Sequence, residues 1–489
     1  MMKVLAALVI LCSATALVLA TPLDDYVKKY DPHYEYTILT DYTVRIPDSY
    51  TVYVLNMTSQ KWLNESIVDR SIWYHFLFVT IPDRLTITDA SFIYVTGGSN
   101  GPGTVPPDPT SDKDVLMSSM FAVGTGSIGA CLRQIPNQRI TFYEDPKKKS
   151  RSEDGIIAYT WKHFIDDPSQ PEYLLRLPMT KAVVRAMDTI TDFAKKVRPE
   201  TDLQKYMIAG GSKRGWTTWT TAAVDKRVFG IAPIVLDCLN FVKNLHHHYR
   251  SLGGWTFAFE DYYEEDVTLH LDNPITQQLA DIVDPYAYRD RLTMPKLVVT
   301  ASGDEFFLPD DSHYYYNDMK GPTYLKITPN SEHSQTGHYV DDLFAMRGFF
   351  LAIYNKMKLP KMTWERKETD TTGSITMYTD TKPLTVTCYR AKTLGDRRRD
   401  FRLVGIDTTT GQPGPQAIPW LPFSVQNPSE GVYHVEFDKP DKGWIGFYIL
   451  ATFPGVKDTV LEFTTEVNII PDVFPFPDCQ GKGCYGSLV

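Results

Sequence analysis

After its first twenty residues, the 489-residue sequence has no hydrophobic run long enough to span a bilayer, which takes about 20 mostly apolar residues. The rest of the chain is therefore not expected to enter a membrane. The first residues differ, because Met1, Met2 and Lys3 precede an apolar run over 4–11, and small residues follow up to Ala20. This order is typical of a signal peptide over residues 1–20 and predicts a secreted, extracellular protein.

Cysteine is scarce, with six residues in the chain. Cys12 lies in the predicted signal peptide. Cys479 and Cys484 are separated by Gln-Gly-Lys-Gly, a flexible segment that favours a small disulfide loop. The other three match no metal-binding spacing and are expected to be buried thiols, of which at least one is free or paired with another chain: Cys131, Cys238 and Cys388.

Basic charge is not in excess either, since the formal net charge is -9 and both signs are mixed along the chain. A nucleic-acid partner is therefore not expected. Three adjacent histidines, 246–248, lack the carboxylate or thiolate spacing of a metal site, and we interpret them as a polar surface. Neither a metal ion nor another cofactor is expected.

Two glycosylation sequons agree with secretion: Asn56 in Asn-Met-Thr and Asn64 in Asn-Glu-Ser. Such short patterns also arise by chance, so they support the signal peptide and do not replace it.

From residue 90 onward, short apolar runs alternate with helical segments. Strands are expected over 92–96, 128–133, 206–209, 229–236, 297–301 and 324–328, and helices over 179–197 and 339–357. Short, continuously apolar strands are typical of a parallel sheet that is buried on both faces. The pattern predicts an α/β fold with a mostly parallel sheet covered by helices.

The two ends of the chain have a different pattern. Antiparallel strands over 34–54 and 72–82 are expected to extend the sheet at one edge. After residue 360, strands alternate with turns without a helical period, which predicts a small β-sandwich domain. The expected domains are a main domain over 21–359 with a cap insertion around 240–290, a sandwich over 360–470 and a tail over 471–489.

One motif points to chemistry. The sequence Gly-Gly-Ser-Lys-Arg-Gly over 210–215 follows the strand 206–209 and opens a helical segment. A strand-to-helix turn this sharp holds its serine, Ser212, in strained backbone geometry, and neighbouring glycines relieve the crowding. It predicts the nucleophile elbow of an α/β-hydrolase. The alternative is an ordinary turn whose serine only caps the helix.

A serine nucleophile needs an imidazole to accept its proton and a carboxylate to orient that imidazole. In α/β-hydrolases the acid and then the histidine follow in loops after later strands. Asp304 and His333 occupy these two loops, which predicts a catalytic triad of Ser212, Asp304 and His333. The first alternative acid is Glu305, and Asp310 or Asp311 is less favoured.

Backbone N–H groups should bind the oxyanion that forms during acyl transfer. Lys213, directly after the nucleophile, is expected to supply one of them. The second is expected from the glycine-rich loop after the strand 92–96, at Gly98 or Ser99. Taken alone, that loop fits a plain turn equally well.

Beyond these residues, the chain resembles the PhoPQ-activated pathogenicity-related family. The matching stretches are Leu-Asp-Asp-Tyr-Val (23–27), Leu-Arg-Gln-Ile-Pro-Asn-Gln (132–138), Leu-Pro-Met-Thr-Lys (177–181), Gly-Ser-Lys-Arg-Gly-Trp (211–216), Gly-Asp-Glu-Phe-Phe (303–307) and Arg-Asp-Phe-Arg (399–402). The resemblance implies an α/β-hydrolase core with Ser212, Asp304 and His333 at the triad positions. Because eukaryotic members include a secreted repressor of cell proliferation, it also implies an extracellular signalling role.

The elbow departs from the usual Gly-x-Ser-x-Gly in one position, where Arg214 replaces a small residue. We therefore expect the helix to lie further from the sheet. The two basic residues, Lys213 and Arg214, are also candidates for binding an anionic group. The elbow is also similar to the Ser-Arg-x-Gly elbow of glucuronoyl esterases.

Two functions from different classes follow. The first is a secreted serine hydrolase that acts on an ester or peptide substrate, as an esterase or a dipeptidyl-peptidase-like enzyme. A dipeptidyl-peptidase-like enzyme would hold the substrate's ammonium group with Glu153-Asp154 or Glu260-Asp261. The alternative function is a non-catalytic ligand that binds a cell-surface receptor.

Overall fold

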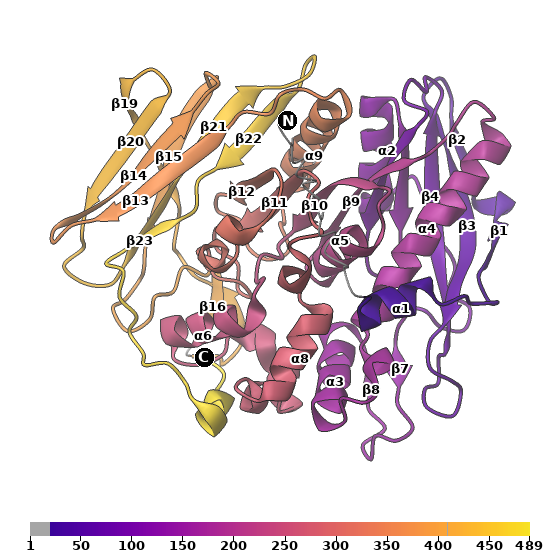
Figure 1. Ribbon diagram of the computed structural model, residues 1–489, viewed down its shortest axis with the longest axis horizontal. Helices are drawn as coiled ribbons and strands as arrows, with labels where there is room; N and C mark the ends of the chain where they lie inside the picture. Colours follow the sequence, from indigo (N-terminus) through magenta and orange to yellow (C-terminus); the bar gives the residue numbers. More distant parts are fainter. Residues whose placement is uncertain (1–19, 408) are drawn as a thin grey trace, which may run out of the picture.

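The structure is a computed structural model that describes residues 20–407 and 409–489. One long sheet crosses the molecule, with helices on both faces and a second, smaller sheet at one end (Figure 1). The predicted signal peptide lies, except for Ala20, outside the described residues. No helix among the described residues is long and apolar enough to cross a membrane.

The centre of the long sheet is parallel. Six strands follow in the order β6-β5-β9-β10-β11-β12, and every neighbouring pair in this run is parallel. Their bounds are β5 (Ala90–Val95), β6 (Ile128–Leu132), β9 (Lys205–Gly211), β10 (Val228–Ile234), β11 (Lys296–Ala301) and β12 (Thr323–Thr328). The ends of each strand lie within two residues of those of a predicted strand. The largest extension at a carboxyl end is that of β9, which continues two residues beyond the predicted end at 209. The topology confirms the α/β-hydrolase fold class.

Antiparallel strands extend the sheet at the β6 edge, as predicted. They are β1 (Glu35–Ile38), β2 (Val44–Ile46), β3 (Tyr50–Lys61) and β4 (Ile72–Pro82). The long pair β3 and β4 carries this extension, and β4 pairs antiparallel with β6.

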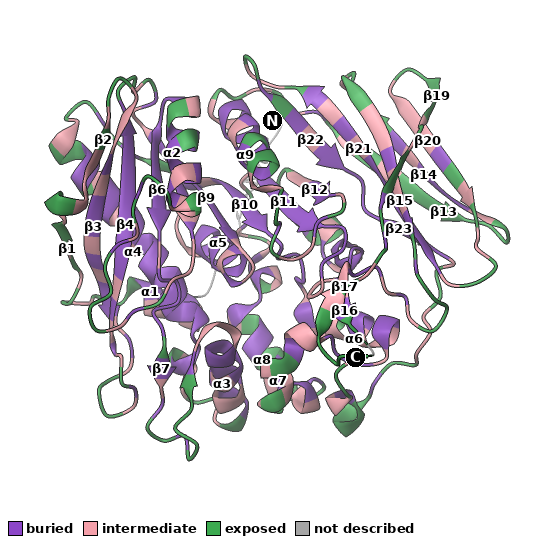
Figure 2. Ribbon diagram, turned by 180° about the vertical axis from the view of Figure 1, so that it is seen from behind, coloured by how far each residue is buried: buried purple, intermediate pink, exposed green. Residues whose placement is uncertain are grey.

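Helices cover both faces because neighbouring residues of a strand point to opposite sides. On β5, Phe92 stacks on Phe121 of α2 (Lys113–Thr125) with ring centroids 3.8 Å apart. Its neighbour Ile93 belongs to the core on the opposite face, under α4 (Arg176–Val197) and α5 (Lys213–Val224). The helix α9 (Tyr339–Tyr354) lies beside α2. The central strands are almost entirely buried as a result (Figure 2).

A cap of short helices lies between β10 and β11, in the interval predicted for it. It comprises α6 (Phe241–Leu252), η3 (Phe257–Phe259), α7 (Glu260–Glu264), η4 (Thr268–His270), α8 (Pro274–Val283) and η5 (Pro285–Tyr288). The helix α3 (Glu153–Asp166), from the segment before α4, packs against α7 and α8. In Figure 1 this group lies together below the sheet.

The C-terminal region is a β-sandwich, as predicted, but one of its two sheets continues the hydrolase sheet. Pairing between β12 and β22 through Leu325 and Thr464 makes this junction. The strands on that side are β15 (Thr385–Lys392), β18 (Leu421–Phe423), β21 (Ile445–Pro454), β22 (Val460–Thr464) and β23 (Asn468–Ile470). The other sheet has the order β13-β14-β20-β19, with β13 (Met362–Glu368), β14 (Thr372–Thr379), β20 (Val432–Asp438) and β19 (Gln426–Ser429).

Pairing at β12 satisfies backbone groups that an open sheet edge would leave free. Phe437 and Phe447, with ring centroids 5.0 Å apart, pack between the two layers of the sandwich. The domain boundaries that we expected at 359 and 470 stay a prediction.

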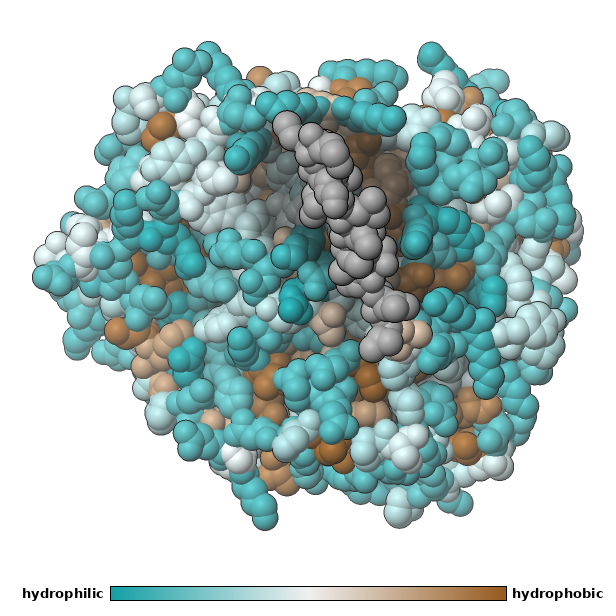
Figure 3. All heavy atoms as spheres, in the orientation of Figure 1, coloured by the Kyte–Doolittle hydropathy of each residue, from teal (hydrophilic) through white to brown (hydrophobic). Residues whose placement is uncertain are grey.

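The tail ends in η8 (Gly481–Tyr485), which packs on η4 of the cap. Cys479 and Cys484 form a disulfide there, whereas Cys131, Cys238 and Cys388 are buried free thiols, as expected. The face drawn in Figure 3 is mostly hydrophilic, with hydrophobic residues scattered over it.

Candidate active site

Ser212 occupies the turn between β9 and α5. Its backbone has φ 55° and ψ -123°, a combination that a residue with a Cβ rarely adopts. Two hydrogen bonds hold the turn: Ser212 N–H donates to Ile234 C=O at 2.8 Å, and Trp216 N–H donates to Ser212 C=O at 3.0 Å. The strained turn is the geometry expected of a nucleophile elbow.

Glycine allows α5 to approach the sheet at this turn. A Cβ on Gly215 would lie 3.0 Å from the carbonyl oxygen of Ile234 and 3.1 Å from that of Gly210. The helix is therefore in close contact with β10 and β9. The prediction from Arg214 that the helix would lie further from the sheet was wrong. Gly215, one position later than in the usual motif, provides the contact instead.

Three predicted residues meet at the carboxyl end of the parallel strands. The Nε2 atom of His333 lies 2.8 Å from the Oγ atom of Ser212. On the other side of the ring, His333 Nδ1 lies 2.9 Å and 2.8 Å from the two oxygens of Asp304. The carboxylate is held in turn by the N–H groups of Phe306 at 2.7 Å and Phe307 at 3.1 Å.

Electrostatics around His333 favour the protonated ring. Burial alone would lower its pKa, but the charges of Asp304 and, to a lesser extent, Glu305 outweigh burial and raise the pKa above 6.5. The rings of Phe306 and Phe307 flank the imidazole, with centroids 4.8 Å and 5.6 Å away. A proton taken up by Nε2 is therefore stabilised beside Asp304.

The alternative acids have other partners. Glu305 accepts a hydrogen bond from the backbone N–H of His333 at 3.0 Å and not from its ring. Asp310 bonds to His247 Nε2 at 3.0 Å and to Arg399 at 2.7 Å. Asp311, which is also buried, has its pKa raised well above 3.8 by burial and then by Asp237 and Asp310.

Of the oxyanion candidates, Lys213 is the first residue of α5, so its N–H has no carbonyl one turn earlier to bind. The carbonyls of Gly98 and Ser99 accept hydrogen bonds from the side chains of Gln138 at 3.1 Å and Gln134 at 3.4 Å. Neither Gly98 nor Ser99 lines the pocket beside Ser212. The oxyanion roles of these three residues stay predictions.

The basic pair after the nucleophile is already matched by acids. Lys213 Nζ lies 2.8 Å from Asp154 and 3.1 Å from Glu153, and Arg214 lies 2.6 Å from Glu153. Burial would raise the pKa of Glu153, but Arg214 and Lys213 hold it at about 2. Lys213 and Arg214 are therefore not free to bind an anion. Glu153 and Asp154 are likewise not free to bind an ammonium group.

A partly open pocket of about 50 Å³ lies beside Ser212. Its walls are mostly aromatic and come from α3, α5, the cap and the loop after β11: Trp161, Trp216, Phe241, Trp255, Phe259, Tyr262, Phe306 and Phe307. Arg176, Lys213 and Asp154 add the charged groups. Such a pocket excludes water and accepts a small apolar group.

Two members of this site were not predicted from the sequence. Glu153 was a candidate only for binding an ammonium group, and Arg176, which directly precedes the stretch 177–181 that carries the family resemblance, was not a candidate. The usable signal was an arginine in the otherwise apolar sequence Leu-Leu-Arg-Leu-Pro-Met over 174–179.

The histidine run does not form a polar surface. His247 and His248 are buried, with 1% and 3% of their surfaces exposed, and only His246 is partly accessible. Successive residues of α6 are turned by about 100° around the helix axis, and the buried face of the helix includes the adjacent His247 and His248. His246 lies near the sulfurs of Cys479 and Cys484, but these are joined in the disulfide.

The two sequons differ in accessibility. Asn64 is exposed in the turn after β3, where its side chain accepts a hydrogen bond from the N–H of Ser66 at 2.9 Å. Asn56 lies within β3, paired to Thr37 of β1, and its side-chain oxygen is buried. Glycosylation at either position stays a prediction.

Comparison with known proteins identifies relatives along the whole chain. The family model of the PhoPQ-activated pathogenicity-related proteins matches residues 23–402. Autocrine proliferation repressor protein A of Dictyostelium discoideum is 37% identical over 493 residues, which cover 98% of this chain and 96% of that protein.

Similar solved structures are more distant. An acetyl xylan esterase from Paenibacillus sp. R4 has 12% sequence identity and a TM-score of 0.46, covering 66% of this chain and 91% of that one. Acetyl xylan esterase 1 from Thermoanaerobacterium sp. JW/SL YS485 has 14% identity and a TM-score of 0.43, covering 65% and 88%. At this distance they carry no argument about the substrate. The family match and the relative at 37% identity do decide the family, as the resemblance implied: the chain belongs to the PhoPQ-activated pathogenicity-related proteins.

Proposed function

We propose that this protein is a serine hydrolase in which Ser212, His333 and Asp304 transfer an acyl group from an ester or a peptide to water. The observation that carries the proposal is the chain of hydrogen bonds from Ser212 Oγ through His333 to Asp304. Its position beside an apolar pocket supports the proposal, since water is excluded where the substrate would bind.

In the first half of the reaction, Ser212 Oγ attacks the substrate carbonyl carbon while its proton moves to His333 Nε2. The carbonyl electron pair moves onto the oxygen, and in this proposal the N–H of Lys213 donates to that oxyanion. When the intermediate collapses, the bond to the leaving group breaks, and His333 returns the proton to it. The product is an ester between Ser212 and the acyl group.

In the second half, water replaces the leaving group. His333 takes a proton from the water as it attacks the acyl-enzyme, and then gives that proton back to Ser212 Oγ as the acid leaves. Asp304 keeps His333 in the tautomer that presents a lone pair at Nε2, and it stabilises the imidazolium formed in both halves.

Labelling by a fluorophosphonate tests this function. We expect covalent modification of the wild-type protein, with the mass added on Ser212, and no labelling of Ser212→Ala. Ser111→Ala, which removes an exposed hydroxyl, is the matched control and should label like wild type. Labelling of Ser212→Ala to the same extent as wild type is the result that would overturn the proposal.

A second function is favoured by the relative at 37% identity, whose name describes an autocrine repressor of proliferation. We propose that this chain also acts outside the cell through a cell-surface receptor. Adding purified wild-type or Ser212→Ala protein to the cells that produce it separates two cases. Slower proliferation with both proteins means that signalling is independent of catalysis, whereas an effect of the wild type alone means that it needs the reaction.

Secretion is part of this proposal. Support comes from the signal-peptide pattern, from the disulfide, which is typical of oxidising compartments, and from the exposed sequon at Asn64. Protein recovered from the culture medium should begin near residue 21 and lose mass on deglycosylation. Asn64→Gln should remove that mass, and Asn56→Gln should not. Retention of the full chain inside the cell would contradict the proposal.

A further inference from the structure

Arg176 occupies an unusual position in the wall of the pocket beside Ser212. It is the first residue of α4, and 3% of its surface is exposed. Its guanidinium carbon lies 4.2 Å from the centre of the Trp216 ring, and one terminal nitrogen donates to the carbonyl oxygen of Lys213 at 3.1 Å. The guanidinium is therefore held rigidly next to the nucleophile's own helix.

No carboxylate of the described residues lies within ion-pairing distance of this guanidinium, although the charge of Asp154 acts on it from further away. Within residues 20–407 and 409–489, no acidic oxygen lies within 4 Å of the nitrogens of Arg176, and its Nε has no hydrogen-bond partner. The nearby acids form ion pairs with other residues: Glu153 with Lys213 and Arg214, and Asp154 with Lys213. Asp154 also accepts a hydrogen bond from the Tyr262 hydroxyl at 3.0 Å.

Ion pairing sets Arg176 apart from the other cations of the region. Glu153 and Asp154 form ion pairs with Lys213 and Arg214, whereas Arg176 forms none with the described residues. Burial lowers the pKa of Arg176 to about 10, so the guanidinium still carries its charge at neutral pH. The third acid of the region, Asp261, lies against Gly155 of α3 and forms no ion pair with Arg176.

A buried charge without a partner is costly, because desolvation is not repaid by an ion pair. The cost falls when a ligand brings the missing anion, and a planar guanidinium matches a carboxylate with two parallel hydrogen bonds. Most of the remaining wall is aromatic or aliphatic and suits a short apolar arm, and Lys213 and Asp154 are its other charged residues. Size, apolar walls and one unpaired cation together describe the group that would fit.

We propose that this pocket binds a carboxylate carried on a short aliphatic arm of the substrate's acyl part, with Arg176 as its ion-pair partner. This inference rests on the serine hydrolase function proposed above. Two sources share this chemistry: the half-ester of a small dicarboxylic acid, and a peptide with an acidic residue on the acyl side of the scissile bond. The volume of about 50 Å³ limits the arm to a few carbon atoms.

Matched substrates test the proposal and separate the sources. Monoethyl glutarate and ethyl valerate differ by the terminal carboxylate, and Ala-Glu and Ala-Gln p-nitroanilides differ by charge alone. In at least one pair we expect the anionic member to have a kcat/KM about 10-fold or more above its neutral counterpart. The pair that shows the preference identifies the source, and equal turnover within both pairs overturns the proposal.

Variants of Arg176 assign the preference to the guanidinium. Arg176→Gln should abolish the preference, because it removes the charge but keeps a donor, while Arg176→Lys should retain part of it. The preference surviving unchanged in Arg176→Gln would overturn the assignment. If Arg176→Gln does not fold, as circular dichroism would reveal, the comparison of Arg176→Lys with wild type decides, and an unchanged ratio there counts against the proposal.

Binding separates this inference from the catalytic function. Because Arg176 stacks on Trp216, a carboxylate that engages Arg176 should change the tryptophan fluorescence of the Ser212→Ala protein. Monoethyl glutarate should produce a saturable change, and ethyl valerate at the same concentration should not. If none of the substrates is turned over but this binding is seen, the catalytic proposal fails and the carboxylate site stands. If turnover is seen without selective binding, only the carboxylate site fails.

Discussion

Asp304 links the position of a single side chain to the pH dependence of the whole reaction. It accepts hydrogen bonds from His333 and from two backbone N–H groups, so its carboxylate is fixed. Since His333 must be neutral to accept the proton of Ser212, activity should rise with pH as the ring loses its proton. The pKa of His333 is raised by Asp304 against the effect of burial, which places this rise above pH 6.5.

Asp304→Asn tests this coupling. Loss of the carboxylate removes both the tautomer control and the stabilised imidazolium, so kcat/KM should fall by about 10³- to 10⁴-fold. The remaining activity should rise at lower pH than in wild type, because the charge that raises the pKa of His333 is gone. Measured pH–rate profiles check both effects. Glu305→Gln is the control and should cost less than about 10-fold, since Glu305 bonds the backbone of His333.

Two glycines at the elbow differ in what surrounds them. A Cβ on Gly215 would lie 3.0 Å from a backbone carbonyl, whereas a Cβ on Gly211 would have nothing within 4 Å. Gly215→Ala should therefore push α5 from the sheet and lower the free energy of unfolding by about 1–3 kcal/mol. Gly211→Ala, four residues away, should leave it within about 0.5 kcal/mol. Denaturant unfolding of both variants checks the prediction, and equal stability losses would contradict it.

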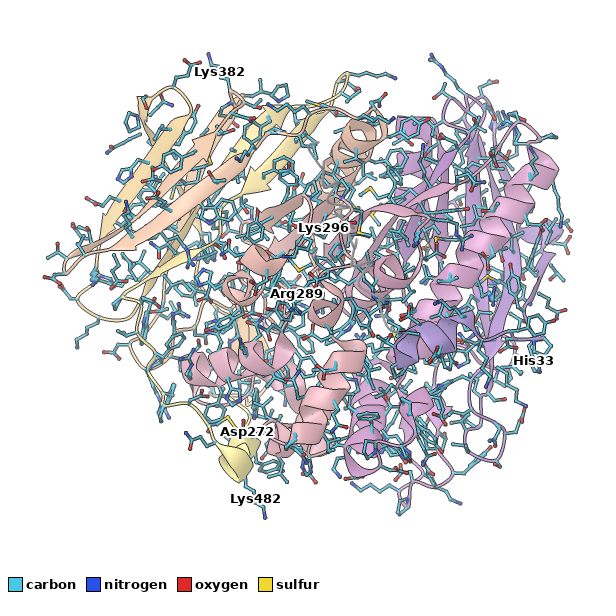
Figure 4. The ribbon with its side chains drawn as sticks, viewed as in Figure 1. His33, Asp272, Arg289, Lys296, Lys382 and Lys482 are labelled. Atoms are coloured by element: carbon cyan, nitrogen blue, oxygen red, sulfur yellow. A yellow bond between two sulfur atoms is a disulfide. The ribbon has the colours of Figure 1, made fainter. Side chains whose placement is uncertain are left out.

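At the scale of elements, the tail over 471–489 supports the wall of the pocket. Trp255, which lines the pocket, donates its N–H to Ser487 C=O at 2.9 Å and accepts from Val489 N–H at 2.8 Å. Its indole N–H donates to the carbonyls of Cys484 and Tyr485. Asp272 of the cap lies beside the tail (Figure 4), and it accepts from Gly481 N–H at 2.5 Å.

Opening the disulfide should loosen this support. Replacing both Cys479 and Cys484 by serine removes a constraint on the unfolded tail worth about 2 kcal/mol for so short a loop. Amide hydrogen exchange of Trp255 and Val489 should become faster, and KM should rise more than kcat falls. Dithiothreitol should reproduce the change in wild type and have no further effect on the double variant. Unchanged exchange at Trp255 would show that the tail does not hold the pocket.

At the scale of the whole molecule, the C-terminal strands share a core with the parallel sheet. One cluster of buried residues joins Val299 of β11 and Phe349 of α9 to Phe447 and Phe463 of the sandwich. Tyr324 of β12 stacks on Phe463 of β22 with ring centroids 4.1 Å apart. The sandwich is thus attached by a common apolar layer as well as by strand pairing.

Unfolding should therefore be cooperative across both regions. Calorimetry should give one main transition, because the sandwich cannot unfold without exposing apolar surface of α9 and β12. Phe463→Ala, at the junction, should lower the transition temperature of the whole molecule by removing about 3–5 kcal/mol of packing. Two separate transitions, with only one moved by Phe463→Ala, would mean that the regions unfold as independent domains.

The order of elements was readable from the sequence because it depends on local patterns. Short apolar runs located the parallel strands, the period of apolar residues located α4, and the segment between His333 and Pro360 located α9. The glycine-rich turn marked Ser212, and the succession of acid and histidine after later strands marked Asp304 and His333. These positions meet in space because the carboxyl ends of parallel strands share one edge of the sheet.

The sequence by itself determined which strands build the sheet and which three residues face one another at its edge. Only the tertiary structure decided which charges are paired, which histidines are buried, and that β22 closes the edge left by β12. The reason is physical: distances between segments far apart in the chain decide that Lys213 pairs with Asp154 and that Arg176 has no ion-pair partner among the described residues. Local periodicity predicts the direction in which a side chain points from its own helix or strand. It does not predict which residue of a distant segment that side chain contacts.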